Sequence, residues 1–550
     1  MTERQQRGDP SGETTGVPQM HSAETGTGWT ALRPLRVPMF RNLLFADLVS
    51  DIGTFMQGVG AAWLMVSQGA GPLLVALIQT ASALPFFLLA LPAGALGDIF
   101  DRRKLIVATE VWMLFVAVAL AALALLHWIT PWMLLLLTLA LSIGDALEAP
   151  TWRAVLPEVV PPEDLLPAIA LNGIEFNLAR AIGPALGGFL IAVASVGTAF
   201  TLNALSFLGV LWVIVRWKRP SRKRGSPQET LSGATRAAIR YARNAPDMLT
   251  VLGRIGVIMF FASAFWALLP TISHGLRGSA TLYGLLLTVF GGGAILGAMV
   301  LQRVRSSFSA DAMLVIGTTV FAATLWATAT FRSIVPLCVA IAFAGSAWTA
   351  VMSLMSTVMQ GLAPDWVRAR AQAVFMLVYM GAWAGGSAFW GYVAGHRGTH
   401  FSFMAAAIGT AASPLLILIS RLPDAPANLG AWDHWGKPML VGEVALDQGP
   451  VLVTVEYQIE AKDSDEFLAA LEKFSRVRRR DGASRWGVYY DTERPTLYLE
   501  TFIVESWAEH LRQHDRLTQA DRDVEERLHQ FEAKPAKVRH FIYARSKGRR

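Results

Sequence analysis

Long apolar runs dominate the chain between Asn42 and Ser420. Twelve of these runs each reach the ~20 residues that a helix needs to cross ~30 Å of hydrocarbon. Since lipid offers no hydrogen-bond partner to a backbone amide, each run is predicted to be a helix. A buried helix of a soluble core is the alternative for any one run, but twelve in succession indicate a membrane protein. The predicted spans are 42–67, 74–97, 105–127, 131–150, 167–195, 197–216, 248–272, 281–303, 311–331, 334–360, 369–394 and 399–420.

The polar segment 217–247 divides the twelve predicted spans into six and six. An even number of spans in each half gives both halves the same orientation, so the repeat is parallel, about an axis normal to the membrane. Two such bundles can rock about a central site, which favours a carrier over a channel. A shift of 202–203 residues aligns landmarks of the two halves: Trp63 with Trp266, Gly94 with Gly297, Arg102 with Arg305, Pro162 and Glu163 with Pro364 and Asp365, and Gly183 with Gly385.

Charge is spread unevenly along the 550 residues. Residues 441–550 hold 39 charged side chains, whereas residues 42–215 hold 16. The chain is therefore a long apolar body with a charged tail, which excludes a disordered protein and a simple soluble enzyme. The single Cys338 excludes a disulfide scaffold. The net charge is +7, but the basic residues flank apolar runs, which suggests anionic lipid rather than nucleic acid as their partner.

Lysine and arginine in the loops predict the orientation. With a cytoplasmic N-terminus, twenty basic residues flank the spans on the cytoplasmic side, and only Arg277, Arg332 and Arg397 lie opposite. By the positive-inside rule both termini and the tail are expected in the cytoplasm. Residues 1–34 lack a long apolar core and are expected to form a disordered lead rather than a signal peptide. This pattern favours a bacterial inner membrane.

The loop after the second span reads GALGDIFDRRK, from Gly94 to Lys104. It resembles the loop signature of the major facilitator superfamily, Gly-x-x-x-Asp-Arg-x-Gly-Arg-Arg/Lys. The resemblance implies that Asp98 contacts the start of span eleven and the loop arginines, which would lock one conformation. Ile99 and Asp101 depart from the signature, and Asp101 is a second candidate for the lock. Ordinary charge at a lipid-facing loop is the alternative for the predicted lock residues Gly94, Asp98, Asp101, Arg102 and Arg103.

Span five contains GPALGG, which resembles the Gly-Pro-x-x-Gly-Gly motif of antiporter branches of the same superfamily. Proline removes a backbone donor and bends a helix, while glycines allow close packing. The resemblance implies export coupling with little leak, and a generic packing face is the alternative. The motif residues are Gly183, Pro184, Gly187 and Gly188, with Ala179 where the fuller motif has glycine.

The tail alternates as β-α-β-β-α-β, which predicts a ferredoxin-like α+β module. RRRDGASRWGVYYD and ETFIVESWAEHLRQHDR resemble the soluble tail of the enterobactin-exporter-like branch of the superfamily. Related small domains pair into dimeric barrels, and some are cofactor-free monooxygenases, so dimerisation and a tethered enzyme are both considered. The predicted elements are strands 451–459, 486–490, 497–504 and 538–543 and helices 463–478 and 506–531.

Ionisable side chains inside the spans are candidates for transport, since a charge in the bilayer costs at least a few kcal/mol. Asp47 and Asp51 are four apart on one helix face, and Asp51 lies about 14 Å in from Asn42. We expect a polar cavity in which Asp51 or Glu175 carries a proton and Arg180 serves as counter-charge or substrate anchor. The transport candidates are Asp51, Asp145, Glu148, Asn172, Glu175 and Arg180.

Structural roles are the alternatives for the same residues. Arg180 could pair with Asp145 or Glu148, and Glu148 with Arg153 could form a cytoplasmic gate pair. His510 and His514 are four apart on a predicted helix, a spacing open to a metal ion, but no clear third ligand follows. No metal and no cofactor are therefore predicted.

The sequence as a whole predicts an all-α polytopic membrane protein of two six-helix bundles with an α+β tail. The expected function is export of a small organic molecule, a siderophore or a drug-like compound, by alternating access and proton antiport. An importer of the same fold and a membrane-tethered monooxygenase are the alternatives. The expected parts are 1–34, the lead; 35–216, the first bundle; 217–247, the central loop; 248–422, the second bundle; 423–439, a linker; and 440–550, the cytoplasmic domain.

Overall fold

A computed structural model describes residues 31–217, 231–276, 278–304, 307–423, 428–430, 432 and 444–544. Most of the expected lead and linker and part of the central loop, with Arg222, lie outside these residues, as does Arg305. The Asp98 side chain also lies outside the described set, although its backbone belongs to a helix.

Local sequence signals set the helix starts of the first half. Proline occupies the first turn of three helices, where its missing N–H costs no hydrogen bond. The side chains of Asp101, Thr130 and Ser195 cap three helices by accepting a backbone N–H from three residues further on. The six helices are α1 (Pro38–Ser67), α2 (Pro72–Ile99), α3 (Arg102–Leu125), α4 (Pro131–Val159), α5 (Leu165–Val193) and α6 (Val196–Arg216).

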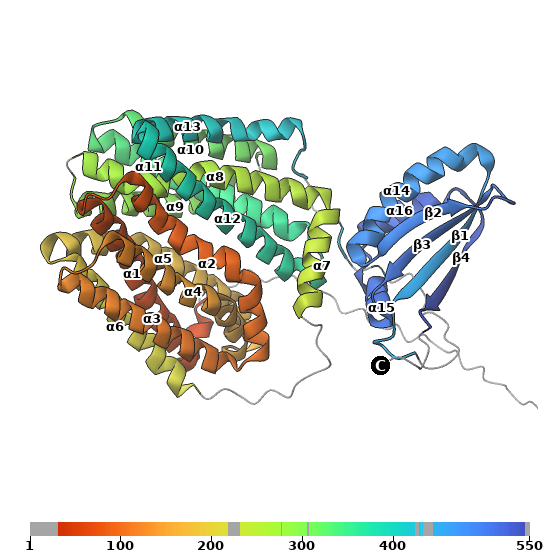
Figure 1. The fold of residues 1–550 in the computed structure, drawn as a ribbon, viewed down its shortest axis with the longest axis horizontal. Helices are drawn as coiled ribbons and strands as arrows, with labels where there is room; N and C mark the ends of the chain where they lie inside the picture. Colours follow the sequence, from red (N-terminus) through yellow and green to blue (C-terminus); the bar gives the residue numbers. More distant parts are fainter. Residues whose placement is uncertain are drawn as a thin grey trace, which may run out of the picture.

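The second half repeats this packing (Figure 1). α1 packs on α5 and α6, α2 on α4, and α3 on α6; their counterparts α8, α9 and α10 pack on α12 and α13, on α11, and on α13. The helices are α8 (Pro246–Gly275), α9 (Ala280–Val304), α10 (Ala310–Thr330), α11 (Ile334–Gly361), α12 (Asp365–Arg397) and α13 (Thr399–Ala412), which continues as a 3-10 turn over Ser413–Leu418.

The predicted constant shift between the halves holds for only part of the chain. The starts of α11 and α13 match those of α4 and α6 under that shift, Ile334 with Pro131 and Thr399 with Val196. In contrast, α8, α9 and α10 all begin later than the same shift would place them, and α12 begins earlier. Trp63 and Trp266 therefore stand at different heights on α1 and α8. The repeat is carried by the packing of the helices rather than by those matched residues.

Eleven helices among the described residues are long and apolar enough to cross a membrane. α1, at 30 residues, is outside this set, and its middle carries Asp47, Asp51 and Gln57. We count α1 as the twelfth span because it packs within the first half as α8 packs within the second. Large apolar side chains are exposed on the outer helix faces, where lipid would cover them, among them Phe115, Leu136, Trp212, Val335 and Phe343.

The halves meet mainly along two helix pairs, α2 with α12 and α5 with α9, and α8 also contacts α1 and α2. The Thr80 hydroxyl donates to the Ala384 carbonyl at 2.9 Å, and the Trp63 and His274 rings lie 5.7 Å apart. The Trp63–His274 contact lies at the ends of α1 and α8 next to loops 68–71 and 276–279, and Gly391 of α12 packs on Pro72 and Leu73 at the start of α2. The halves are thus packed directly against each other on the side of those loops, which positions the cavity described below.

The tail forms a four-stranded antiparallel sheet in the order β2-β3-β1-β4, the ferredoxin-like arrangement. The predicted helix 506–531 is two helices, because Thr518 forms a capping box with Asp521 and starts a new one. The last strand is longer than predicted. The elements are β1 (Val451–Ile459), α14 (Ser464–Asp481), β2 (Ser484–Tyr490), β3 (Leu497–Val504), α15 (Trp507–Arg516), α16 (Gln519–His529) and β4 (Glu532–Ile542).

The tail docks on the second half through α7 (Leu231–Asn244), an amphipathic helix within the central segment (Figure 1). Arg240 of α7 donates to the Glu509 carboxylate at 2.9 Å. The Arg480 guanidinium lies 5.3 Å from the centre of the Tyr241 ring. Arg516 stacks 4.5 Å from the Trp366 ring at the start of α12. These contacts fix the tail to one half of the membrane body.

Candidate substrate cavity

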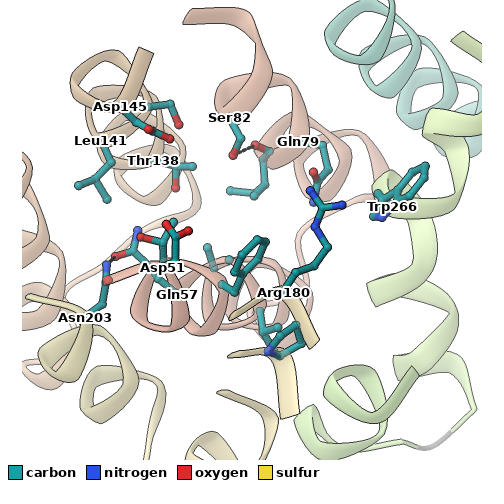
Figure 2. A pocket seen from close by; sticks show the side chains of 18 of the residues that line it. Asp51, Gln57, Gln79, Ser82, Thr138, Leu141, Asp145, Arg180, Asn203 and Trp266 are labelled. Carbon is teal, nitrogen blue, oxygen red and sulfur yellow. Dashed lines mark hydrogen bonds between the residues drawn. The ribbon is translucent and has the colours of Figure 1, made fainter. Parts of the chain in front are cut away.

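A cavity of about 380 Å³ lies between the two halves (Figure 2). All six helices of the first half contribute side chains to it, and α8, α9, α11 and α12 contribute from the second. Its volume falls within the range of small-molecule sites in proteins. Both halves line the cavity, so a ligand there contacts the two bodies that alternating access would move.

The first half supplies the carboxyl groups of the lining: Asp47, Asp51, Glu110, Asp145 and Glu148. Asp47 and Asp51 are one helical turn apart on α1, as their spacing predicted. The Thr109 hydroxyl donates to the Glu148 carboxylate at 2.5 Å, and the Glu110 carboxyl lies within hydrogen-bonding range of Glu148. The carboxyls therefore form one acidic wall.

Uncharged polar groups continue this wall. The Asn203 amide of α6 donates to the Gln57 carbonyl of α1, which joins the two helices beside the cavity. The helices approach closely because Gly53 leaves room; a Cβ at that position would lie 2.6 Å from the Asn203 oxygen. Gln79, Ser82 and Thr138 complete the polar lining. The first half thus offers hydrogen-bond donors and acceptors as well as acids.

Arg180 lies at the boundary between the two halves. Figure 2 shows its side chain directed toward Trp266. The guanidinium lies 4.8 Å from the Phe176 ring centre. The ionisable groups that interact electrostatically with it are Asp51 and Tyr379. Among the described residues no ion pair joins Arg180 to Asp145 or Glu148, the partners of the structural alternative.

The second half faces the acids with aromatic rings. Trp266 is at the centre of this wall, 4.6 Å from the Trp348 ring centre and 4.8 Å from that of Trp383. Tyr379 packs on Trp383 at 5.7 Å, and Phe290 also lines the cavity. The Trp383 indole N–H is buried with no hydrogen-bond partner in the described part of the chain. The cavity therefore has an acidic wall and an aromatic wall.

The other two predicted transport residues lie outside the lining. Glu175 is buried on α5, and neither carboxyl oxygen has a hydrogen-bond partner among the described residues. Asn172, one turn earlier, is half-buried. Glu148 is buried and Arg153 is exposed, and the gate role of this pair stays a prediction.

The loop motif has described partners within the first half. Arg102 forms an ion pair with Glu158 of α4 at 2.7 Å, and Arg103 donates to the Ile214 carbonyl of α6 at 3.1 Å. Asp101 caps α3. Gly94 has open space around it. The predicted contact of Asp98 with span eleven falls on a side chain outside the described set and stays a prediction.

The GPALGG motif faces two directions. A Cβ at Gly183 or Gly187 would lie 2.5 Å from Phe55 or 3.0 Å from the Met56 backbone, so these glycines hold α5 against α1. Gly188 faces α9, where a Cβ would lie 2.7 Å from the Ala280 oxygen. The Pro184 carbonyl of α5 contacts Gly284 of α9. Gly183 and Gly187 therefore pack α5 within its own half, whereas Pro184 and Gly188 contact the other half.

The predicted histidine pair is in contact in the tail. The Nε2 atoms of His514 and His510 lie 3.2 Å apart, and the His540 ring lies 4.6 Å from that of His510. Within the described residues no group of three or more His, Cys, Asp or Glu is placed to hold a metal ion.

Sequence reasoning missed Glu110 and the aromatic wall. Glu110 is the one carboxylate residue within the predicted span 105–127, so the rule that identified the other acids could have found it. The tryptophans were interpreted as interface or packing residues, because spacing along one helix does not reveal which rings of four helices meet.

Known proteins resemble this chain at both the family and the fold level. A family described as transmembrane secretion effectors matches residues 29–547. In solved structures, a bacterial homologue of the lysosomal transporter Spinster, in an inward-facing conformation, is 15% identical with a TM-score of 0.54, and the match covers 72% of this chain and 96% of that one. The nucleoside transporter NupG is 10% identical with a TM-score of 0.59, covering 69% and 99%. These structures show the fold.

Curated relatives match about half of the chain. The MFS-type transporter YfiS of Bacillus subtilis is 27% identical over 49% of this chain and 66% of its own length. The staphyloferrin A transporter of Staphylococcus aureus is 22% identical over 46% and 64%, and the enterobactin exporter EntS of Salmonella typhi is 25% identical over 51% and 67%. The chain thus spans slightly less than two thirds of the first two relatives. On its family match, the chain belongs to the transmembrane secretion effector family of the major facilitator superfamily, and it has the multi-pass helical fold of that superfamily.

Proposed function

We propose that this protein exports a small organic molecule across the cytoplasmic membrane by alternating access, in exchange for protons. The observation that carries the proposal is the cavity between two repeated bundles, lined by carboxyls and packed shut on the side of loops 68–71 and 276–279. A site contacted by both halves and closed on one side suits a carrier that opens each side in turn.

Buried acids without partners support proton exchange. Both oxygens of Glu175 and one of Glu110 are unpaired in the described part of the chain. An unpaired carboxylate away from water costs several kcal/mol, and taking up a proton removes that cost. Asp51 and Glu175 are the proposed proton carriers, with Asp145 and Glu148 in the same acidic region and Arg180 as the counter-charge.

Export and the cargo rest on resemblance. The family description names secretion, and two relatives are named for a siderophore, staphyloferrin A or enterobactin. GPALGG resembles an antiporter motif, and its last glycine, Gly188, packs α5 closely against α9. A siderophore or a drug-like compound is the proposed cargo, and the bacterial inner membrane with both termini in the cytoplasm is the proposed location.

Inverted membrane vesicles test the direction and the carriers. An exporter loads such vesicles when respiration acidifies their interior, whereas an importer does not. We expect proton-driven accumulation of a cargo chosen from a panel of enterobactin and cationic dyes, and its loss when Asp51→Asn and Glu175→Gln are combined. Asp365→Asn is the matched control, since Asp365 is exposed at the start of α12. Unchanged accumulation in the double variant would show that the proton assignment is wrong.

We also propose that the tail pairs with a second copy through the uncovered face of its sheet. Tyr489, Leu499 and Phe541 are exposed on β2, β3 and β4 of this sheet. Leu499→Cys in a Cys338→Ala background should form a cross-linked dimer in membranes, whereas a cysteine at exposed Glu493 should not. A purely monomeric band from both variants contradicts the pairing.

A further inference from the structure

The two walls of the cavity differ in chemistry, and the difference points to one kind of cargo. We propose that the cavity binds an amphipathic organic cation, a ligand with a positive nitrogen or phosphorus centre and a flat or aromatic apolar body. This inference deepens the proposed function, because it assigns a substrate class to the same cavity.

The charged residues of the cavity lining favour a cation. Of the described residues that line the cavity, five carry a carboxyl group and Arg180 alone carries a basic one. The carboxyls come from α1, α3 and α4, so a ligand in the cavity meets several of them together. A cation is attracted by each carboxylate and displaces its proton, whereas a polyanion meets like charge.

Arg180 lies apart from most of the acidic wall. Its guanidinium stacks on Phe176 at 4.8 Å and lies near Phe55 at 6.0 Å. Figure 2 shows it at the edge of the lining, directed toward Trp266 rather than into the group of acids. Arg180 is therefore placed to balance Asp51 when the cavity is empty, and it leaves most of the acidic wall without a basic partner.

The aromatic wall offers a surface for the apolar body of a cation. Trp266, Trp348, Trp383 and Tyr379 form a continuous group of rings, with centre separations of 4.6, 4.8 and 5.7 Å between neighbours. Indole faces attract cations, and aromatic ligands stack against them. A ligand between the walls would place its charge on the acids and its apolar body on the rings.

The size of the cavity also fits this kind of ligand. The cavity volume of about 380 Å³ accommodates a molecule of a few rings. The lining holds more apolar than charged residues, including Phe55, Met113, Leu141, Leu287 and Phe290. Such a lining suits a cation whose charge is shielded by apolar substituents.

Two probes of equal shape and opposite charge test the inference on the unmodified protein. Tetraphenylphosphonium and tetraphenylborate have the same tetrahedral arrangement of phenyl rings. We expect purified protein in detergent to bind the phosphonium at least tenfold more tightly than the borate, measured by equilibrium dialysis with protein-free micelles as the blank. Equal binding of the two, or tighter binding of the borate, overturns the inference.

Variants locate the binding. Trp266→Leu should weaken phosphonium binding at least tenfold, whereas Trp212→Leu, on the exposed face of α6, should leave it unchanged. Arg180→Gln should keep or tighten phosphonium binding. If the cavity instead bound an anion, removing this positive charge would weaken binding of that anion. If Trp266→Leu does not fold, competition of ethidium with the phosphonium on the wild-type protein replaces it, and failure to compete counts against a shared cavity.

The binding assay is separate from the transport assay. Phosphonium binding without accumulation in inverted vesicles means that the export proposal fails while the substrate class stands. Accumulation of enterobactin by a protein that does not bind the phosphonium means that export stands and the cation assignment is wrong.

Discussion

Three histidines of the tail lie against one another, and the central one, His510, is buried. Burial, together with the neighbouring His540 and His514, lowers the pKa of His510 to about 3. Burial also lowers the pKa of His540. Both groups therefore stay neutral in the folded domain at pH values where they would be protonated in an unfolded chain.

This difference predicts an acid-sensitive tail. Below the ordinary histidine pKa of about 6.5, the unfolded chain binds more protons than the folded one, so the free energy of unfolding falls as the pH drops toward 3. At pH 5 the loss from His510 is about 2 kcal/mol. Hydrogen exchange of the β3 amides in the full chain should be faster at pH 5 than at pH 7 after correction for intrinsic rates.

A leucine at position 510 provides the check. His510→Leu should remove most of the pH dependence, while His529→Gln, at an exposed site on α16, should retain it. A wild-type tail with equal protection at both pH values would contradict the argument.

At the level of single residues, the rule that lipid penalises charge found Asp51, Asp145, Glu148 and Arg180, all of which line the cavity. The same rule named Glu175, which lies outside the lining. Depth along a helix can be read from the sequence, because each residue adds a fixed rise along the axis. The direction in which a side chain points depends on how each helix is rotated against its neighbours, and that rotation is set by distant residues.

Among the elements, the contact of α5 with α9 depends on Gly188 of α5 and Gly284 of α9. A Cβ at Gly284 would lie 2.4 Å from the Pro184 carbonyl oxygen, a distance that forces the backbones apart. Gly284→Ala should therefore weaken closure on this side and reduce the transport rate at least tenfold. Gly292→Ala on the same helix meets nothing within 4 Å and is the matched control.

Cross-linking between α5 and α9 measures the closure directly. Cysteines at Phe189 and Leu285 should cross-link less in Gly284→Ala than in the parent. Parental transport and parental cross-linking in Gly284→Ala would show that this contact does not control closure.

Helix and strand positions were largely predictable, because runs of about 20 apolar residues have one stable form in lipid. The tail strands 451–459 and 497–504 match their predictions. The break after α15 was missed, since Thr518 and Asp521 act as a capping box only when the chain turns there. The amphipathic helix α7 was also missed within a segment interpreted as a loop.

At the scale of the whole molecule, the docking of the tail depends on a partly buried ion pair. Arg240 and Glu509 have side-chain exposures of 22% and 9%, whereas Arg236 and Glu505 are exposed at 61% and 68%. Removing one member of a buried pair costs far more than removing an exposed one. Arg240→Ala should weaken docking by about 1–3 kcal/mol, and Arg236→Ala by less than about 1 kcal/mol.

Limited proteolysis of the full chain measures this difference. Cleavage within α7 should be faster in Arg240→Ala than in Arg236→Ala or the parent. Equal rates in all three would show that the pair does not hold the tail.

The two-bundle architecture was predictable from the spans and the charge of the loops, but the closed side of the cavity and the docking of the tail were not. Both arise from surfaces that lie far apart in the sequence, such as Thr80 with Ala384 and Arg516 with Trp366. A single sequence holds no direct sign of such pairs.

The described side-chain contacts of the tail with the membrane helices and α7 have a mechanical consequence. They fall on α7 and the start of α12, so in the proposed alternating access the tail would move together with the second bundle. If the proposed alternating access occurs, a donor dye on the tail and an acceptor at the Arg102 end of α3 would report each change of conformation as a change of energy transfer, and turnover could be counted molecule by molecule.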